Sequence, residues 1–392
     1  MILVINTGSS SIKMSLLERS SMQLIAEGLA QRLGENTASL CWIISDNRNE
    51  QNLSETNHQG AMAQMLEILF SHIDKRSIVA VGHRVVHGGE LFVEPTLLNE
   101  KIIADIQSLS HLAPLHNPSN LVGIEAAMSR LPNIPHIAVF DTAFHQTMPQ
   151  KASLYAVPYK WYEDYGVRRY GFHGTSHHYV GEEAAKLLDR DFKNCSLLIA
   201  HLGNGCSATA ISQGVSVDTT MGLTPLEGLV MGTRSGDIDP GLIDFIARLT
   251  GYSLEKITSI LNRESGLLGL SGRSNDMRTL LEASEAGDEK ATLAIEVFCY
   301  RLAKALLGLT VGLTQLDAIV FTGGIGEHAA LVRSKTLAQL KLLGVLVDEK
   351  HNQVHGQLSS GCISAFESKV TVLVVPTNEE KMIAAYVAQV MD

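Results

Sequence analysis

A hydroxyl-rich glycine turn follows the first apolar run of the chain. Residues 1–5 are apolar, and residues 6–13 read Asn-Thr-Gly-Ser-Ser-Ser-Ile-Lys. A strand that ends in such a turn can direct backbone N–H groups and hydroxyls toward a phosphate. Residues 197–207 resemble this pattern, since they read Leu-Leu-Ile-Ala-His-Leu-Gly-Asn-Gly-Cys-Ser. Two related turns, half a chain apart, predict a duplicated domain that binds a polyphosphate.

A third glycine-rich turn, at residues 323–326, follows an apolar run and precedes a helical pattern. The free N–H groups and the positive dipole end of such a helix suit a nucleotide. The Walker pattern is absent from the sequence, and no turn has the dinucleotide-binding glycine spacing with its downstream acid. The sequence therefore excludes both a P-loop and a Rossmann site.

Two arginines lie close to glycines in the sequence. Arg84 ends an apolar run just before two glycines, and Arg234 lies between Gly232 and Gly236. A guanidinium held in this way favours a planar clamp for a carboxylate or a phosphate. Asp239, which precedes a proline, is expected to cap a helix instead.

Two acidic residues follow apolar runs at expected strand ends, where open α/β sheets bind ligands. Asp141 follows residues 134–140, and Glu379 follows residues 370–375. Thr377 and Glu380 fit a capping box, which leaves Glu379 to face a metal. Two such carboxylates suit a Mg²⁺ ion that keeps its waters and binds nucleotide phosphates.

The histidines at 173, 177 and 178 are spaced closely enough to be considered as ligands of a zinc ion. No H-E-x-x-H motif or third ligand accompanies them, so a zinc site is disfavoured. His173 is better interpreted as a hydrogen-bond donor to a transferring phosphoryl group. His116, between two prolines, fits either a functional role or a turn cap.

Composition narrows the class of protein. The chain has 392 residues, a formal charge of -10 and a pI near 5.8, which argue against nucleic acid or an anionic membrane as partner. Its length predicts two domains. Five cysteines without a C-x-x-C pair, no export signal and no membrane span indicate a cytoplasmic protein with reduced thiols.

Apolar runs alternate with helical spacings, which predicts an α/β fold. We expect strands within residues 1–45 and at 78–86, 134–140, 196–201, 207–217, 318–321 and 370–375. We expect helices at 60–73, 119–130, 240–250, 253–263, 288–313 and 328–343. The likeness of residues 139–142 to residues 320–323 suggests that this later element is duplicated too.

Together these segments resemble the acetate kinase family, in the superfamily that also contains sugar kinases, chaperone ATPases and actin. The matching motifs run in family order at residues 6–13, 82–89, 113–118, 139–149, 169–177, 201–205, 221–228, 232–240, 323–327 and 376–380. The resemblance implies a duplicated ribonuclease-H-like (actin-like ATPase) fold whose two lobes enclose a central nucleotide cleft. Residues 1–145 with 380–392 would form the N-terminal lobe, and residues 146–379 the nucleotide-binding lobe.

The resemblance also implies a homodimer that phosphorylates acetate from ATP, giving acetyl phosphate and ADP reversibly, with Mg²⁺, or Mn²⁺ as an alternative. Its implied catalytic residues are Arg84, Asp141, His173 and Arg234, and its metal residues are Asn6 and Glu379. Its nucleotide-binding residues are Lys13, His201, Gly203, Asn204, Gly205, Asp276, Met277, Arg278, Gly324, Ile325, Gly326 and His328. Arg84, Val86, Leu115, Phe172 and Pro225 would bind acetate. Two residues depart from the family pattern: His328 stands where the family usually has Asn, and Cys206 stands where Gly is common.

This chemistry needs no general base, because a carboxylate is already ionised near neutral pH. The obstacle is repulsion between acetate and the γ-phosphate, which two arginines and Mg²⁺ would neutralise during a direct in-line transfer. Two alternatives stay open at this point: a kinase for propionate or another short-chain acid, and a nucleotide-driven conformational protein.

Overall fold

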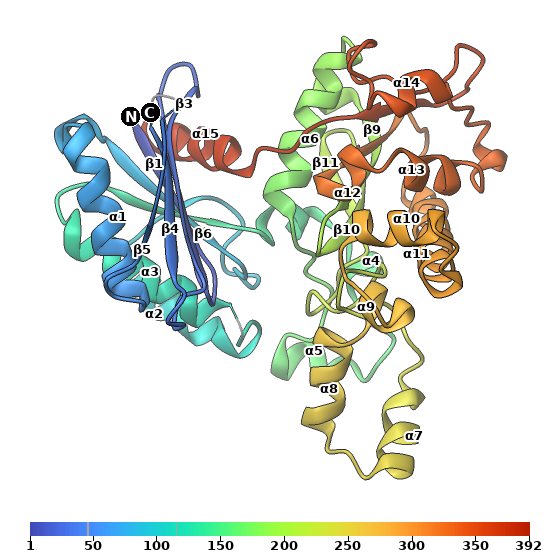
Figure 1. Ribbon diagram of the computed structural model, residues 1–392, viewed down its shortest axis with the longest axis horizontal. Helices are drawn as coiled ribbons and strands as arrows, with labels where there is room; N and C mark the ends of the chain where they lie inside the picture. Colours follow the sequence, from blue (N-terminus) through green and yellow to red (C-terminus); the bar gives the residue numbers. More distant parts are fainter. Residues whose placement is uncertain (45–46, 115) are drawn as a thin grey trace. The chain divides into compact units, whose positions relative to one another are not determined.

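The computed structural model describes residues 1–44, 47–114 and 116–392. The chain divides into two compact units (Figure 1). Unit 1 comprises Met1–Ala143 and Asn378–Asp392, and unit 2 comprises Phe144–Thr377.

Unit 1 is built on an eight-stranded mixed sheet in the order β5-β4-β3-β2-β1-β6-β8-β7. The strands are β1 (Ile2–Thr7), β2 (Ser11–Leu17), β3 (Leu24–Gln31), β4 (Ser39–Ile44), β5 (Asn47–Asn52), β6 (Ala80–Val85), β7 (Thr96–Leu97) and β8 (His136–Phe140). The first five form the antiparallel meander expected from the apolar runs, whereas β6 lies parallel to both β1 and β8.

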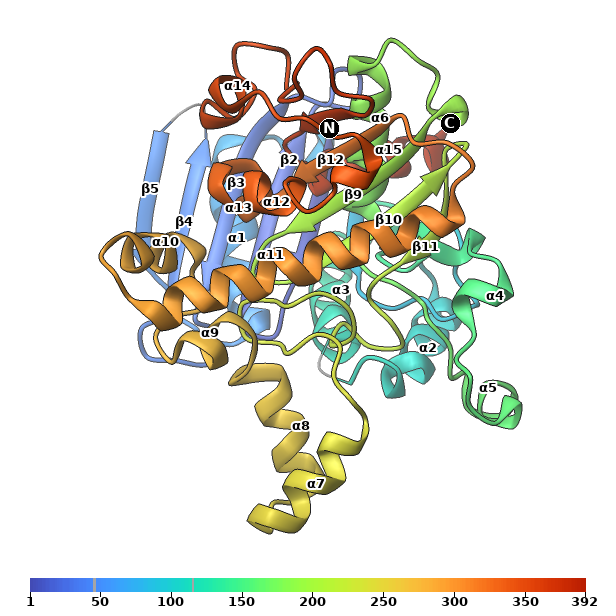
Figure 2. The same cartoon turned by 90° about the vertical axis from the view of Figure 1, so that its right-hand side faces the viewer.

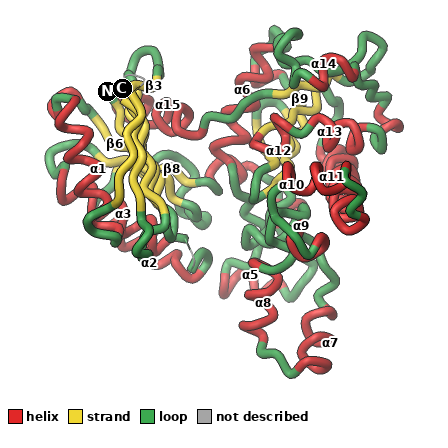
Figure 3. The backbone as a smooth tube through the Cα atoms, viewed as in Figure 1, coloured by secondary structure: helices red, strands yellow, loops and turns green. Residues whose placement is uncertain are grey.

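Helices cover both faces of this sheet, as Figure 3 shows. They are α1 (His58–His72), α2 (Glu100–Ser108), α3 (Asn117–Arg130) and α15 (Glu379–Met391). Alternate residues of β1 supply the two cores: Leu3 and Ile5 pack in the cluster with α1, and Ile2 and Val4 in the cluster with α15. A Cβ at Gly82 would lie 2.8 Å from methyl groups of α15, so glycine permits this close approach.

Unit 2 holds a five-stranded sheet in the order β11-β10-β9-β12-β13. The strands are β9 (Ser196–Leu202), β10 (Cys206–Ser212), β11 (Val215–Thr219), β12 (Ala318–Thr322) and β13 (Thr371–Val374). Helix α6 (Gly174–Leu187) packs on one face through Val180 and Ala184. Figure 2 shows the long helix α11 (Glu289–Leu309) running across the front of the same sheet.

The other helices of unit 2 are shorter. They are α4 (Gln150–Ser153), α5 (Tyr159–Tyr165), α7 (Gly241–Thr250), α8 (Leu254–Arg263), α9 (Gly266–Ser271), α10 (Met277–Glu285), α12 (Gly323–His328), α13 (Ala330–Leu337) and α14 (Glu349–Gln353). In the described part of the chain, no helix combines the length and apolarity that crossing a bilayer requires.

The two sheets repeat one topology. Strands β3-β2-β1-β6-β8 of unit 1 correspond to β11-β10-β9-β12-β13 of unit 2. In each set the first three strands pair antiparallel with one another. The third strand then pairs parallel with the fourth, and the fourth pairs parallel with the fifth. This repetition confirms the predicted α/β class with a duplicated ribonuclease-H-like fold.

Three local predictions are wrong. Residues 207–217 form two strands rather than one, because Gln213 and Gly214 turn the chain with positive φ angles. The expected helix 328–343 is divided between α12, α13 and a short 3-10 turn. The likeness of residues 139–142 to 320–323 also misleads, because β12 occupies the position of β6, and it is β13 that corresponds to β8.

Candidate functional site

In unit 1, an ion pair joins the ends of two adjacent strands. Arg84 lies near the end of β6 and Asp141 follows β8, so both stand at the carboxyl edge of the sheet. Arg84 Nε and Nη2 donate to the two carboxylate oxygens of Asp141 at 3.0 and 2.6 Å. Burial opposes the charge on Arg84, but the carboxylates of Asp141 and Glu379 outweigh it and raise the pKa of the guanidinium. This bidentate bond fixes the plane of the cation.

Asn6 and Glu379 contact the same guanidinium. Asn6 pairs with Arg84 in the β1–β6 register, and its Oδ1 accepts from Arg84 Nη1 at 3.1 Å. Glu379, at the start of α15, places Oε2 3.7 Å from Arg84 Nε. Burial raises the pKa of Glu379, against the opposing effect of Arg84. Unit 1 thus brings together the predicted residues Asn6, Arg84, Asp141 and Glu379.

These oxygen donors fit a hard cation. Asn6 Oδ1 and the carboxylate of Glu379 are ligand types that Mg²⁺ prefers, and both sit at one end of the sheet. Within the described residues, no group of three His, Cys, Asp or Glu side chains could hold a metal ion. A Mg²⁺ ion bound here would therefore take further ligands from water and phosphate, as this ion commonly does.

The predicted capping box at the start of α15 is wrong. Asn378 is the N-cap residue of the helix, and its Oδ1 accepts from the backbone N–H of Lys381 at 2.8 Å, so the helix begins one residue later than the capping box requires. Thr377 Oγ1 instead lies 2.7 Å from Ser176 Oγ within unit 2. Glu380 pairs with Lys13, whose Nζ also contacts Glu27 at 2.8 Å. Lys13, expected to bind nucleotide, is thus held between two carboxylates of unit 1.

Unit 2 contains a cavity of about 600 Å³ between the β9–β10 turn, the start of α10 and helix α12. This volume lies in the range of small-molecule sites. Eight of the residues expected to bind nucleotide line it: Gly203, Asn204, Asp276, Met277, Arg278, Gly324, Ile325 and His328. Asn275, which sequence reasoning missed, also lines the cavity and donates to Asn204 Oδ1 at 2.9 Å.

A tight turn places α12 at this cavity. Gly323 has a φ of +75°, and a Cβ there would lie 2.8 Å from the carbonyl oxygen of Leu202. The carboxylate of Glu327 accepts from the backbone N–H of Gly323 at 2.9 Å and of Thr377 at 3.2 Å. The turn from β12 into α12 is thereby fixed. Gly326, expected to bind nucleotide, is buried within this turn and does not line the cavity.

Arg333, which sequence reasoning also missed, holds the other end of α12. Its Nη1 donates to the carbonyl oxygens of Gly326 and Glu327 at 2.7 and 3.0 Å. Nε and Nη2 bond to Asn352, and Nη2 also to His355. Burial lowers the pKa of Arg333 to about 10. These bonds satisfy the last carbonyls of α12, which explains why the helix ends before α13.

His173 and Arg234 face the same glycine in unit 2. A Cβ at Gly205 would lie 3.5 Å from both Arg234 Nη1 and His173 Nε2. Arg234 Nη1 donates to the carbonyl oxygen of Pro225 at 3.2 Å, and burial lowers the pKa of this arginine. The ring of His201 stacks on His173 at 4.4 Å. Unit 2 thus gathers a guanidinium and two imidazoles around the Gly205 turn.

The residues expected to contact the methyl group of acetate are divided between the units. Val86 is buried in unit 1, and its backbone N–H donates to Asn120. Phe172 and Pro225 belong to unit 2, and Leu115 lies outside the described residues. His116 is the N-cap residue of α3, where its side chain makes no capping hydrogen bond.

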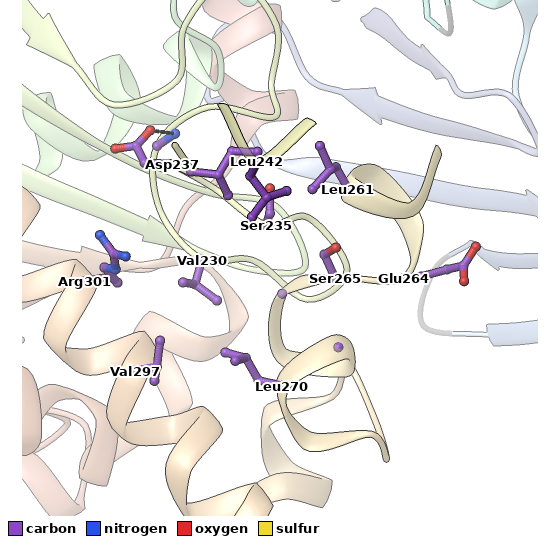
Figure 4. Close-up of a pocket in the computed structure, with 14 residues that line it drawn as sticks. Val230, Ser235, Asp237, Leu242, Leu261, Glu264, Ser265, Leu270, Val297 and Arg301 are labelled. Atoms are coloured by element: carbon purple, nitrogen blue, oxygen red, sulfur yellow. Dashed lines mark hydrogen bonds between the residues drawn. The ribbon is translucent and has the colours of Figure 1, made fainter. Parts of the chain in front are cut away.

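A further cavity of unit 2, about 470 Å³ in volume, contains none of the predicted site residues. Figure 4 shows apolar side chains in its lining, with Val230 and Val297 on the side of the charged Arg301 and Leu261 on the opposite side. Asp237 in its wall accepts from the backbone N–H of Gly228 at 2.8 Å, which ties the surrounding loop together.

The duplicated topology and the cavity place this chain among the ribonuclease-H-like proteins with two related domains. The sequence signature of the acetokinase family matches residues 1–385, so the chain is an enzyme that belongs to this family.

Individual relatives match along almost the whole chain. An acetate kinase of Ectopseudomonas mendocina is 52% identical over 391 residues, covering 100% of this chain and 99% of its own length. A crystal structure of a propionate kinase from Francisella tularensis superposes with a TM-score of 0.94 at 42% identity, covering 98% of both chains. The acetate kinase of Porphyromonas gingivalis has a TM-score of 0.93 at 40% identity, covering 100% of this chain and 99% of that one.

Proposed function

We propose that this enzyme is an acetate kinase, which transfers the γ-phosphoryl group of ATP to acetate and reversibly forms acetyl phosphate and ADP. The observation that carries the proposal is the relationship to enzymes named acetate kinase along the full chain, at 52% identity for one of them. The cavity at the β9–β10 turn and α12 supports a nucleotide site in unit 2. Asp276, Met277 and Arg278 would then lie against the nucleoside.

The charged groups suit a reaction between two anions. Acetate is ionised near neutral pH, so the enzyme needs no base to form the nucleophile. Arg84 and Arg234 would reduce the repulsion between acetate and the phosphates, and His173 would donate a hydrogen bond to the transferring phosphoryl group in a direct in-line transfer. Asp141 would orient Arg84 through the bidentate bond rather than accept a proton.

Asn6 and Glu379 would hold Mg²⁺, which supplies neutralising charge at the phosphates. The contact of both side chains with Arg84 supports this assignment, since it places them beside the proposed phosphoryl-binding cation.

The arginine roles predict large losses of turnover. Arg84→Ala and Arg234→Ala should each lower kcat on the order of 10³-fold, by analogy with arginine fingers. Turnover is measured as acyl-hydroxamate formation, in both directions of the reaction. Circular dichroism verifies that each variant is folded. Arg301→Ala is a matched control, because Arg301 lies at the other cavity, and it should stay within a few-fold of the parent. A folded Arg84 or Arg234 variant with near-parental turnover would remove that arginine from the mechanism.

A propionate kinase is the second candidate, favoured by the structural likeness to the Francisella tularensis enzyme of that name. We expect higher kcat/KM for acetate than for propionate, with Val86→Ala shifting the ratio toward propionate because it enlarges the proposed pocket. One methylene is worth about 1–3 kcal/mol, or roughly 10- to 200-fold. Val93→Ala, at an exposed position of the same unit, should leave the ratio unchanged. A parental preference for propionate would contradict the assignment.

We also propose that the enzyme is a homodimer that uses helix α7. Leu242, Phe245 and Leu249 lie on one side of this helix and are 38, 55 and 69% exposed. Figure 1 shows α7 and α8 extending away from the rest of unit 2. A second copy of the chain that covers this stripe would bury it.

Light scattering tests the dimer. The parent should have twice the chain mass, and Phe245→Glu with Leu249→Glu should yield monomers, because burying two carboxylates in an apolar contact is costly. Asp244→Lys, on the polar side of α7, should remain dimeric. A monomeric parent, or a dimer unaffected by the paired substitution, would be the contrary result.

A further inference from the structure

A single buried hydroxyl connects two imidazoles beneath the Gly205 turn. Ser207 Oγ, on β10, lies 2.9 Å from Nδ1 of His173 and 2.7 Å from Nε2 of His177. Both Ser207 and His177 are fully buried. A serine hydroxyl carries one proton, so it can donate to only one of these rings. If it accepted from both rings, its buried proton would bond to neither, which is costly, so it donates to one ring and accepts from the other.

The environment of His177 decides the direction. Burial lowers the pKa of His177 well below its usual value, and the neighbouring His145 and His201 add to this effect, so the ring is neutral. Its Nδ1 has no hydrogen-bond partner in the described part of the chain. A proton on Nδ1 would leave a buried donor unsatisfied, which is costly, whereas a proton on Nε2 is bonded to Ser207. The proton therefore lies on Nε2 of His177.

The rest of the chain of hydrogen bonds follows from this assignment. Ser207 Oγ accepts from His177 Nε2 and donates its own proton to His173 Nδ1. The Nδ1 atom of His173 is then an acceptor, and the proton of the neutral ring must lie on Nε2. We infer that His177 and Ser207 are positioning residues that fix the tautomer of His173, with its N–H at Nε2.

The fixed tautomer has a consequence for anion binding. Nε2 lies on the edge of the His173 ring that faces Gly205, and Arg234 Nη1 approaches the same glycine, since each atom would lie 3.5 Å from a Cβ there. With the proton on Nε2, the imidazole and the guanidinium both present donors at this turn. The opposite tautomer would present a lone pair, which repels a phosphoryl oxygen. The benefit to catalysis rests on the proposed function, but the tautomer itself does not.

Nitrogen-15 NMR of the histidine-labelled full-length protein without substrates tests the inference directly. Two-bond correlations distinguish the tautomers, and His173→Gln identifies the His173 signals by their loss. The parent should contain the Nε2–H tautomer of His173, and Ser207→Ala should give a mixture. Ser216→Ala is the matched control, because it removes an equally buried bond, from Ser216 Oγ to His145 Nδ1 at 2.8 Å, without touching His173. It should leave the His173 tautomer unchanged.

Two substitutions of His177 provide a second route if Ser207→Ala fails to fold. His177→Gln retains an N–H donor near the Nε2 position and should preserve the His173 tautomer, whereas His177→Phe should give a mixture. In turnover assays, Ser207→Ala should lower kcat by about 3- to 10-fold with little change in KM, because only part of the population has the competent tautomer. Ser207→Thr, which restores the hydroxyl, should recover kcat.

A parent with His173 protonated at Nδ1, or a Ser207→Ala protein with an unchanged tautomer, would overturn the inference and leave the proposed reaction untouched. A correct tautomer in a protein that does not phosphorylate acetate would overturn only the proposed function.

Discussion

The bidentate bond between Arg84 and Asp141 is the interaction on which the site in unit 1 depends. An acidic chain with a net charge of -10 does not attract polyanions by its overall charge, so it must place individual cations. A free arginine side chain would lose much conformational entropy on binding a ligand. Here the buried carboxylate of Asp141 already fixes the guanidinium, and Asn6 and Glu379 complete its surroundings.

In unit 2, too, the cationic side chains are fixed by hydrogen bonds. Here backbone carbonyl groups, rather than carboxylates, accept those bonds. Arg234 bonds to the carbonyl oxygen of Pro225, and Arg333 fixes α12 through the carbonyl oxygens of Gly326 and Glu327. Ser207 links the proposed donor His173 to a buried neutral imidazole. In each case the hydrogen bonds limit the freedom of the side chain, and Arg333, Ser207 and His177 are also fully buried, which is what preorganisation requires.

The sequence predicted the fold class because β1 and β9 have similar apolar runs followed by glycine turns, and the sheets repeat as expected. It failed where a short polar feature overrides a longer pattern. Gln213 and Gly214 split the strand at 207–217, and the Arg333 side chain reaches back to bond the carbonyl oxygens of Gly326 and Glu327 at the end of α12. Glycine turns and isolated charges marked many of the candidate site residues. Asn275 and Arg333 carried no such signal, and Ser207 lies in the 197–207 pattern without standing out there, because the roles of all three arise from contacts with other segments.

The most direct test of this account is a double-mutant cycle between Arg84 and Asp141, measured as kcat/KM for acetate. If Asp141 acts by holding Arg84, Asp141→Ala should lower kcat/KM strongly in the parent but by less than about threefold in the Arg84→Ala background, since coupled residues are not additive. Equal losses in both backgrounds would show that Asp141 acts independently of Arg84, and would contradict the central claim.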